Sequence, residues 1–252
     1  AARCRQFLAG SYLEQPDPNR ALQDPLSFRC ASAVHGSVID ALDFIKHHME
    51  IQLNATDDNP CIFVDEGATS VSQNFETTTL ALGVEMLSAA LNHMSKNICY
   101  RLIHLADPAF TGLTRFLTPA EVKTIAYGTI QKVYTVLDAE NRMLATPSSM
   151  DFIAVAGSIE DHASNLPLAA AKALRIVDNL RYMIGIEIMH GAQAVDLRKK
   201  PALGRVTGPV FETYRRVVPY LNADRNLSLD IEKSYRFIKD GKLFQAIREA
   251  RR

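Results

Sequence analysis

The sequence predicts an all-α protein: a bundle of very long antiparallel helices with a small hairpin near residues 61–72. Apolar residues recur at helical spacing over long stretches, while strand-like runs are confined to one short segment. Turn and cap residues cluster between the helical stretches. A chain of 252 residues, of which 47% are apolar, is long enough to bury a sizeable core.

The clearest helical signal runs from Glu76 to Leu105. Its apolar residues alternate between spacings of four and three. This spacing places them in one apolar stripe, or seam, that can face a neighbouring helix for several turns. Arg101 is the one polar residue in that seam. About 30 residues at ~1.5 Å per residue predict a rod of roughly 45 Å.

Further helices are expected on the same grounds at 33–53, 119–144, 166–195, 208–221 and 228–251, the last interrupted near Gly241. Pro119 would occupy the first turn of its helix, where a missing N–H costs nothing. The run CIFVDEGATSVS offers two short strands around Asp65-Glu66-Gly67, which indicates the hairpin.

Three regions follow from these elements. Residues 1–30 form a loop segment that leads into the bundle and carries candidate site residues, 31–198 form the long-helix bundle, and 199–252 form shorter helices. Helices of this length bury more than one face, which a single chain of this size can hardly cover. Oligomerisation is therefore expected.

The composition argues against several classes of function. The 28 basic residues balance the 28 acidic ones, so there is no bulk electrostatic reason to bind nucleic acid or an anionic membrane. No signal peptide or membrane-spanning apolar run is present. The four cysteines are far apart, and no Cys/His cluster has the spacing of metal ligands. A cytoplasmic protein with free thiols and no metal is expected.

The octapeptide QDPLSFRC, residues 23–30, gathers polar and reactive side chains around one proline. Pro25 disfavours helical backbone at the residue before it, so a bent segment is expected ahead of the helix. Arg29 could clamp a carboxylate through two parallel N–H bonds, which lysine cannot do. The alternative is an arginine that pairs with a local acid.

Two other segments could carry chemistry. In SIEDHAS, Glu160 and Asp161 precede His162, and such neighbours can shift one another's pKa and serve acid–base work. The triplet could equally be a helix start, where acids are favoured. In SQNFET, Asn74 and Phe75 precede the long helix and could simply be a cap and a packing aromatic.

Taken in order, QDPLSFRC, NATDDNP-CIF, NF before a long helix, AENRMLATPSSMD and EDHAS resemble the aromatic amino acid ammonia-lyases, closest to the histidine ammonia-lyase branch. The resemblance covers about residues 23–242 and implies the aspartase/ammonia-lyase-like helical fold and a homotetramer acting on a small-molecule amino acid. It also implies a methylidene-imidazolone (MIO) electrophile formed from an Ala-Ser-Gly that lies upstream in the family and is absent here. The chain therefore looks like the C-terminal half, inactive alone, with a separate N-terminal half as one alternative for its partner.

By position in the motifs, Arg29 resembles the residue that binds the substrate carboxylate, and Gln23 the glutamine near the ring. Phe75 matches the aromatic wall, and Glu160 the acid that faces the imidazole or amino group in histidine-type enzymes. Asn59 looks structural. The departures are Leu26 for the family's tyrosine, Ser72-Gln73 for Gly-Gly and Glu76 for histidine in the family's Gly-Gly-Asn-Phe-His, residues 120–132 for a Gly-Leu-Asn-Ser-Gly stretch, and Ile159 for glutamine.

Three functions remain open at this stage. The first is histidine catabolism, eliminating ammonia from histidine to give urocanate, with Glu160 as the catalytic residue. The second is a ring-independent, ergothionase-like lyase, in which Lys132 could share acid–base work with Glu160, although Lys132 could equally be a surface lysine. The third is a non-catalytic structural fragment.

Overall fold

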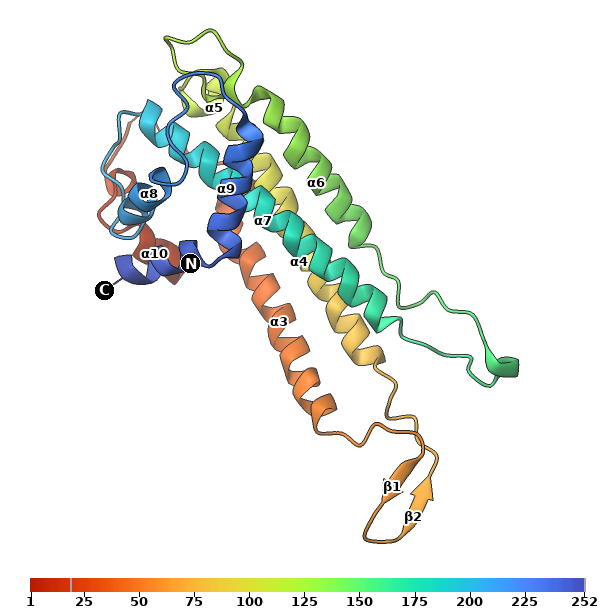
Figure 1. The fold of residues 1–252 in the computed structure, drawn as a ribbon. Helices are drawn as coiled ribbons and strands as arrows, with labels where there is room; N and C mark the ends of the chain where they lie inside the picture. Colours follow the sequence, from red (N-terminus) through yellow and green to blue (C-terminus); the bar gives the residue numbers. More distant parts are fainter. Residues whose placement is uncertain (19, 252) are drawn as a thin grey trace. The chain divides into compact units, whose positions relative to one another are not determined.

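The computed structural model describes residues 1–18 and 20–251. Its α-helices are α1 (Ala2–Leu8), α2 (Leu26–Arg29), α3 (Ala31–Leu53), α4 (Thr78–Leu105), α5 (Pro108–Thr111), α6 (Gln131–Leu144), α7 (Leu166–Leu197), α8 (Thr207–Arg215), α9 (Leu227–Lys239) and α10 (Lys242–Ala250). Short 3-10 helices lie at Tyr12–Glu14, Arg115–Leu117, Ala126–Ile130 and Ala156–Ser158, and the strands are β1 (Cys61–Phe63) and β2 (Ala68–Ser70). The predicted all-α bundle of long helices with one small hairpin is confirmed (Figure 1).

The chain divides into two compact units. Unit 1 comprises Ala1–Ser32, Ser95–Ala139 and Asp178–Arg252, and unit 2 comprises Ala33–Met94 and Glu140–Val177. The helices α4, α6 and α7 each contribute residues to both units. Helix α4 is continuous over 28 residues, as the seam of alternating four and three spacings predicts.

Unit 1 has a core of large side chains. Its fully buried residues include Ile98 and Leu102 on α4, Tyr134 on α6 and Ile186 on α7. Helix α9 lies close to α7 because Gly185 has no side chain: a Cβ there would meet the backbone of Ser234 at 3.1 Å. The small residues of α7 therefore allow close helix packing.

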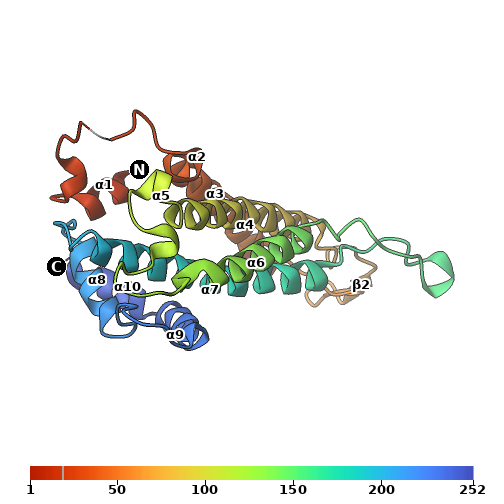
Figure 2. The same ribbon diagram turned by 90° about the horizontal axis from the view of Figure 1, so that it is seen from above.

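Unit 2 is built around α3 and α4, which run antiparallel and are joined by the β1–β2 hairpin (Figure 1). The strands pair antiparallel, with Cys61 opposite Ser70 and Phe63 opposite Ala68. Within this unit, the hairpin and the connection from 145 to 165 extend past the ends of the helices, as Figure 2 also shows. These two connections hold several of the candidate site residues.

Two predicted helices are shorter in the structure. The helix expected at 119–144 begins only at Gln131, because the preceding residues form turns and the 3-10 helix Ala126–Ile130. Gly128 lies against the Phe116 ring, where a Cβ would approach to 2.9 Å, and Tyr127 is fully buried. The helix expected at 208–221 ends at Arg215, and Pro219 disfavours helical backbone at the residue before it.

The other predicted boundaries agree with the structure to within about two residues, including the interruption at Gly241 between α9 and α10. Gly241 has φ +74°, a left-handed conformation that glycine adopts without strain. Among residues 1–18 and 20–251, no helix combines the length and apolar character needed to cross a bilayer.

Candidate active site

The segment QDPLSFRC forms one short turn of helix in unit 1. Pro25 precedes α2, and its carbonyl accepts the N–H groups of Phe28 and Arg29 at 3.0 and 3.2 Å. The Nε of Arg29 donates to the carbonyl of Asp24 at 2.7 Å, so this arginine bonds to the loop backbone. Gln23 and Arg29 are both exposed, which leaves their side chains available to a ligand.

Two contacts from elsewhere in unit 1 hold this turn. The guanidinium of Arg101 on α4 donates through Nη1 to the carbonyl of Ser27 at 3.0 Å. It also forms a two-point ion pair with Glu187 on α7: Nε to Oε1 at 2.5 Å and Nη2 to Oε2 at 3.1 Å. The ring of Phe28 stacks on Phe110, with centroids 5.2 Å apart. The turn that carries Arg29 is therefore fixed from two sides.

In unit 2, asparagine side chains fasten the segment before α4 to the end of α3. Asn59 Oδ1 accepts the N–H of Ser72 at 3.1 Å, and Asn74 Nδ2 donates to the carbonyl of Thr56 at 3.2 Å. The carbonyl of Asn74 accepts from Gln52 at 3.2 Å. Both asparagines are therefore structural, as expected for Asn59, and they hold the segment in which Phe75 lies three residues before α4, 53% exposed.

The segment around Phe75 is bonded to the segment around Glu160. Thr77 Oγ1 and Ser164 Oγ lie 3.1 Å apart. The hydroxyl of Thr78 donates to Glu76 Oε1 at 2.7 Å and lies 3.1 Å from His162 Nε2. Because that hydroxyl gives its proton to Glu76, it accepts from an N–H on Nε2 of His162. A carboxylate, a hydroxyl and an imidazole thus meet next to two of the candidate residues.

From the sequence, His162 is a candidate only as part of EDHAS, and Glu76 is noted only as a departure from the family motif. Their contact joins residues 86 positions apart, with Nε2 and Oε1 at 3.9 Å. No local pattern reveals such a pair. Glu160 itself is exposed on its connection, where it forms an isolated β-bridge with Val155.

Glu85 on α4 holds the start of the connection that carries Glu160. Its carboxylate accepts the N–H groups of Ser148 and Ser149 at 2.5 and 2.7 Å and the Ser149 hydroxyl at 2.8 Å. Burial by itself raises the pKa of Glu85, but these hydrogen bonds and the charge of Lys172 outweigh it and lower the pKa below its usual value. Lys172 in turn donates to the carbonyl of Thr146.

The remaining candidate, Lys132, lies in the first turn of α6 in unit 1 and is exposed. Among the described residues, no group of three or more His, Cys, Asp or Glu side chains is arranged to hold a metal ion. The structure thus places Gln23, Arg29 and Lys132 in unit 1 and Phe75 and Glu160 in unit 2.

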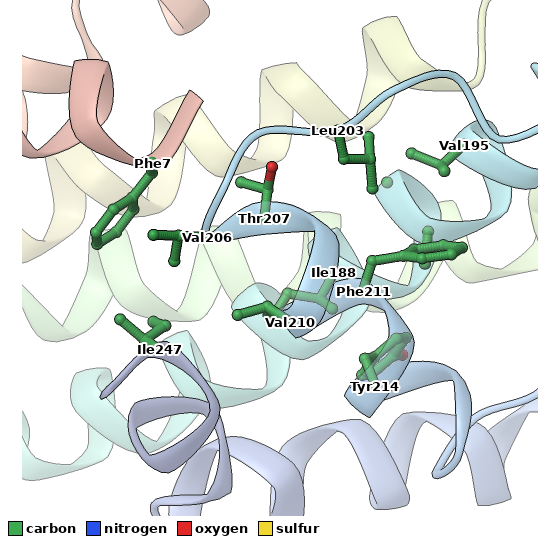
Figure 3. A pocket seen from close by; sticks show the side chains of 12 residues that line it. Phe7, Ile188, Val195, Leu203, Val206, Thr207, Val210, Phe211, Tyr214 and Ile247 are labelled. Atoms are coloured by element: carbon green, nitrogen blue, oxygen red, sulfur yellow. The ribbon is translucent and has the colours of Figure 1, made fainter. Parts of the chain in front are cut away.

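A separate apolar cavity of about 310 Å³ lies in unit 1 (Figure 3). It is lined by side chains from α1, α7, α8 and α10, among them Phe7, Ile188, Phe211 and Ile247. Only Thr207 and Tyr214 contribute hydroxyl groups, and no carboxylate, amine or imidazole lines it. None of the candidate site residues borders it.

The bundle of long helices has the fold of solved ammonia-lyases and aminomutases. Residues 1–216 match the family model for aromatic amino acid lyase, and the chain belongs to that family.

Among its relatives, histidine ammonia-lyase of Shouchella clausii is 36% identical over 96% of this chain and 48% of that protein. Among solved structures, the ergothioneine-degrading ergothionase of Treponema denticola is 60% identical, with a TM-score of 0.91 over 96% of this chain and 49% of that chain. Tyrosine aminomutase of Streptomyces globisporus is 25% identical, with a TM-score of 0.88 over 99% of this chain and 51% of that chain. The chain spans about half the length of the relatives it matches.

Proposed function

We propose that the complete protein is a carbon–nitrogen lyase that eliminates an amine from an amino acid with an imidazole side chain, and that this chain supplies part of its site. The observation that carries the proposal is the 60% identity to ergothionase over 96% of this chain. Family membership and the histidine ammonia-lyase relatives support the same reaction class.

Ergothioneine, a histidine derivative with a trimethylated amino group and a sulfur on the imidazole, is the substrate that this identity favours. In its elimination a base takes a proton from Cβ, and the C–H electron pair forms the Cα=Cβ double bond. The C–N bond breaks, and its electron pair leaves with neutral trimethylamine. A quaternary nitrogen leaves without first gaining a proton, so the reaction demands less electrophilic activation than loss of ammonia.

The MIO ring expected of histidine-type members would have to be formed from residues outside this chain, since no Ala-Ser-Gly is present in it. That ring supplies an electrophile that activates the substrate. The residues here do not fit a site built around it: Leu26, 61% exposed on α2, carries no hydroxyl, and Ser72 and Gln73 occupy the positions of two glycines. These substitutions favour a reaction that proceeds without the ring.

The roles proposed for this chain's own residues follow from their chemistry. Arg29 binds the substrate carboxylate through its guanidinium nitrogens, and Gln23 lies in the same segment as a hydrogen-bonding neighbour. Phe75 offers an aromatic face, which suits both an imidazole ring and a trimethylammonium group. Glu160 faces the imidazole or the amino nitrogen, and Lys132 is its proposed partner in moving the Cβ proton.

A second candidate is the elimination of ammonia from histidine to give urocanate. It is supported by curated relatives named histidine ammonia-lyase, of which those of Shouchella clausii and Geobacillus thermodenitrificans are 36% identical to this chain. The glutamate at position 160 suits the side chain of either substrate. The two candidate substrates differ in the amine that leaves, trimethylamine or ammonia, and in the sulfur that ergothioneine carries on its imidazole.

We further propose that the complete protein is a homotetramer whose sites combine residues from several subunits. The support is the long-helix fold together with exposed apolar residues on the helices of unit 2, such as Leu53, 76% exposed, and Leu174, 71% exposed. Under this proposal the chain alone is inactive. A third possibility, a structural fragment without catalysis, predicts the same helices and no turnover in the complete protein.

The test is to incubate the complete protein separately with ergothioneine and with histidine, and to measure trimethylamine, ammonia and the ultraviolet band of the unsaturated acid. Release of trimethylamine with a rising band supports the first candidate, and ammonia from histidine supports the second. An Arg29→Met variant serves as the site control and should lose most turnover. Absence of any product from both substrates overturns the proposal.

A further inference from the structure

We infer that Arg101 and Glu187 are positioning residues for the substrate carboxylate: they hold the backbone of α2 and so orient Arg29. The inference rests on the proposed function, because it assigns to Arg29 the carboxylate of that substrate. It concerns residues outside the family-like motifs of the chain, on α4 and α7.

The geometry uses the whole guanidinium of Arg101. Nε and Nη2 form the two-point pair with Glu187, at 2.5 and 3.1 Å, and Nη1 reaches the Ser27 carbonyl at 3.0 Å. A planar group with five donors can bind a carboxylate on one edge and a carbonyl at another corner. Lysine offers a single ammonium and cannot reproduce these three bonds in fixed directions.

Burial makes these bonds strong. The side chains of Arg101 and Glu187 are 11% and 23% exposed, and Ser27 is 8% exposed. Hydrogen bonds from a charged group are stronger than neutral ones and are less weakened away from water. Glu187 balances the charge of the guanidinium, which allows Arg101 to lie inside the unit and face a backbone carbonyl.

The held carbonyl lies two residues before Arg29. Helix α2 has only four residues, and a single turn is not stable by itself. Its order depends on outside contacts, which are the Arg101 bond to Ser27 and the packing of Phe28 against Phe110 and His104, with ring centroids at 5.2 and 6.3 Å. Because the Arg29 Nε bonds back to Asp24, the direction of its guanidinium follows the backbone of this turn.

Loss of this support should displace Arg29 rather than remove it. A shift of about 1 Å in a group that binds substrate can cost on the order of 10²-fold in kcat/KM. Since Arg29 binds a carboxylate that is present before and after the reaction step, the larger part of the change should appear in KM. Arg101→Lys, which keeps the charge beside Glu187, should give a smaller change in the same direction.

The experiment has two parts, both on the complete protein. Amide hydrogen exchange in wild type, Arg101→Met and Arg101→Lys follows the N–H groups of Phe28, Arg29 and Cys30, with Arg236→Met as the control. Arg236 forms an exposed ion pair with Glu232 one turn away on α9, in the same unit. The second part is a kinetic double-mutant cycle that combines Arg101→Met with Arg29→Met.

We expect faster exchange at these three amides in both Arg101 variants and unchanged exchange there in Arg236→Met. In the cycle, Arg101→Met should add little to the loss already caused by Arg29→Met. The inference is overturned if exchange at the three amides is unchanged. It is also overturned if the fold-loss in kcat/KM of the double variant equals the product of the losses of Arg101→Met and Arg29→Met. If wild type turns over neither substrate, the proposed function fails, and the exchange result alone decides whether Arg101 orders α2.

Discussion

The two compact units differ in how they bury large side chains. The largest fully buried side chains of the described residues lie in unit 1, except for Ile176, and include Tyr127, Tyr214 and Phe237. Unit 2 instead exposes large apolar residues along its helices, including Leu82, 53% exposed. The core of large, fully buried side chains therefore lies mainly in unit 1.

The segment that carries Arg29 in unit 1 and the connection that carries Glu160 in unit 2 differ in a similar way. The α2 turn in unit 1 is held by a buried arginine and an aromatic stack. The connection in unit 2 is held at its start by Glu85, but residues 151–163 are all exposed. A guanidinium keeps its charge at any ordinary pH, while a carboxylate can be neutralised. The group that bonds directly to the backbone is thus a guanidinium in unit 1 and a carboxylate in unit 2.

The largest expected effect is a cavity in the core of unit 1. Leu102 is fully buried on α4, and Leu102→Ala should lower the free energy of unfolding by about 2–5 kcal/mol. Leu174→Ala, on the exposed face of α7 in unit 2, should change it by less than about 0.5 kcal/mol. Urea unfolding followed by circular dichroism measures both. Equal losses would contradict the proposed difference between the units.

The next effect is acid destabilisation through His190, which is fully buried in unit 1 beside the rings of Tyr127 and Tyr134. Burial lowers its pKa from 6.5 to about 4. Because the folded pKa is lower, the unfolded chain binds the proton more tightly, and stability present above pH 6.5 is lost as the pH falls toward 4. The loss is on the order of 3 kcal/mol.

Unfolding free energies measured between pH 7 and pH 4.5 test this expectation. His190→Gln should flatten the slope across that range, whatever its effect at neutral pH. A variant that keeps the slope of the wild type would show that another group is responsible for it.

A smaller effect is expected at Glu85 in unit 2. Glu85→Gln keeps the size of the side chain but removes the charge that accepts from Ser148 and Ser149, and should cost about 1–2 kcal/mol. Since its folded pKa is lowered, this stabilisation is present above its ordinary value of 4.5 and is lost as the pH falls below it. Hydrogen exchange at Ser148 and Ser149 at pH 7 should accelerate in the variant, and protection equal to wild type would contradict the role assigned to Glu85.

The smallest effect concerns a single helix cap in unit 1. The side chain of Asn226 accepts the N–H of Ser228 at 3.1 Å at the start of α9. Asn226→Ala should cost about 1 kcal/mol, and Asn226→Asp, which can accept the same bond, should be nearly neutral. Thermal unfolding measures both variants. A larger loss of stability in Asn226→Asp than in Asn226→Ala would show that this cap does not stabilise α9.

Much of the fold could be predicted because long helices repeat one local pattern. Apolar spacing predicted 76–105 and 166–195, and the structure has helices at Thr78–Leu105 and Leu166–Leu197. It failed at 119–130, where Tyr127 is buried and Gly128 packs on Phe116. There the contacts with distant residues, rather than local spacing, determine the backbone.

The candidate site was predicted unevenly for the same reason. The order of short motifs pointed to Arg29 and Glu160, because each motif is local. The pair of Glu76 and His162 joins segments 86 residues apart and leaves no local trace. Arg101 did leave one, as the single polar residue of an apolar seam. A charge at such a position must find a partner inside the protein, and here it finds Glu187 and a backbone carbonyl.

The claim that Arg29 receives a substrate carboxylate can be measured directly by inhibition with paired ligands. The complete protein and its Arg29→Met variant would be titrated with histidine and with histamine, which lacks only the carboxylate. We predict that the substitution weakens histidine binding about 10- to 100-fold and leaves histamine binding nearly unchanged, since under the proposed function the carboxylate is the group that Arg29 binds. Equal weakening of both ligands would contradict the account.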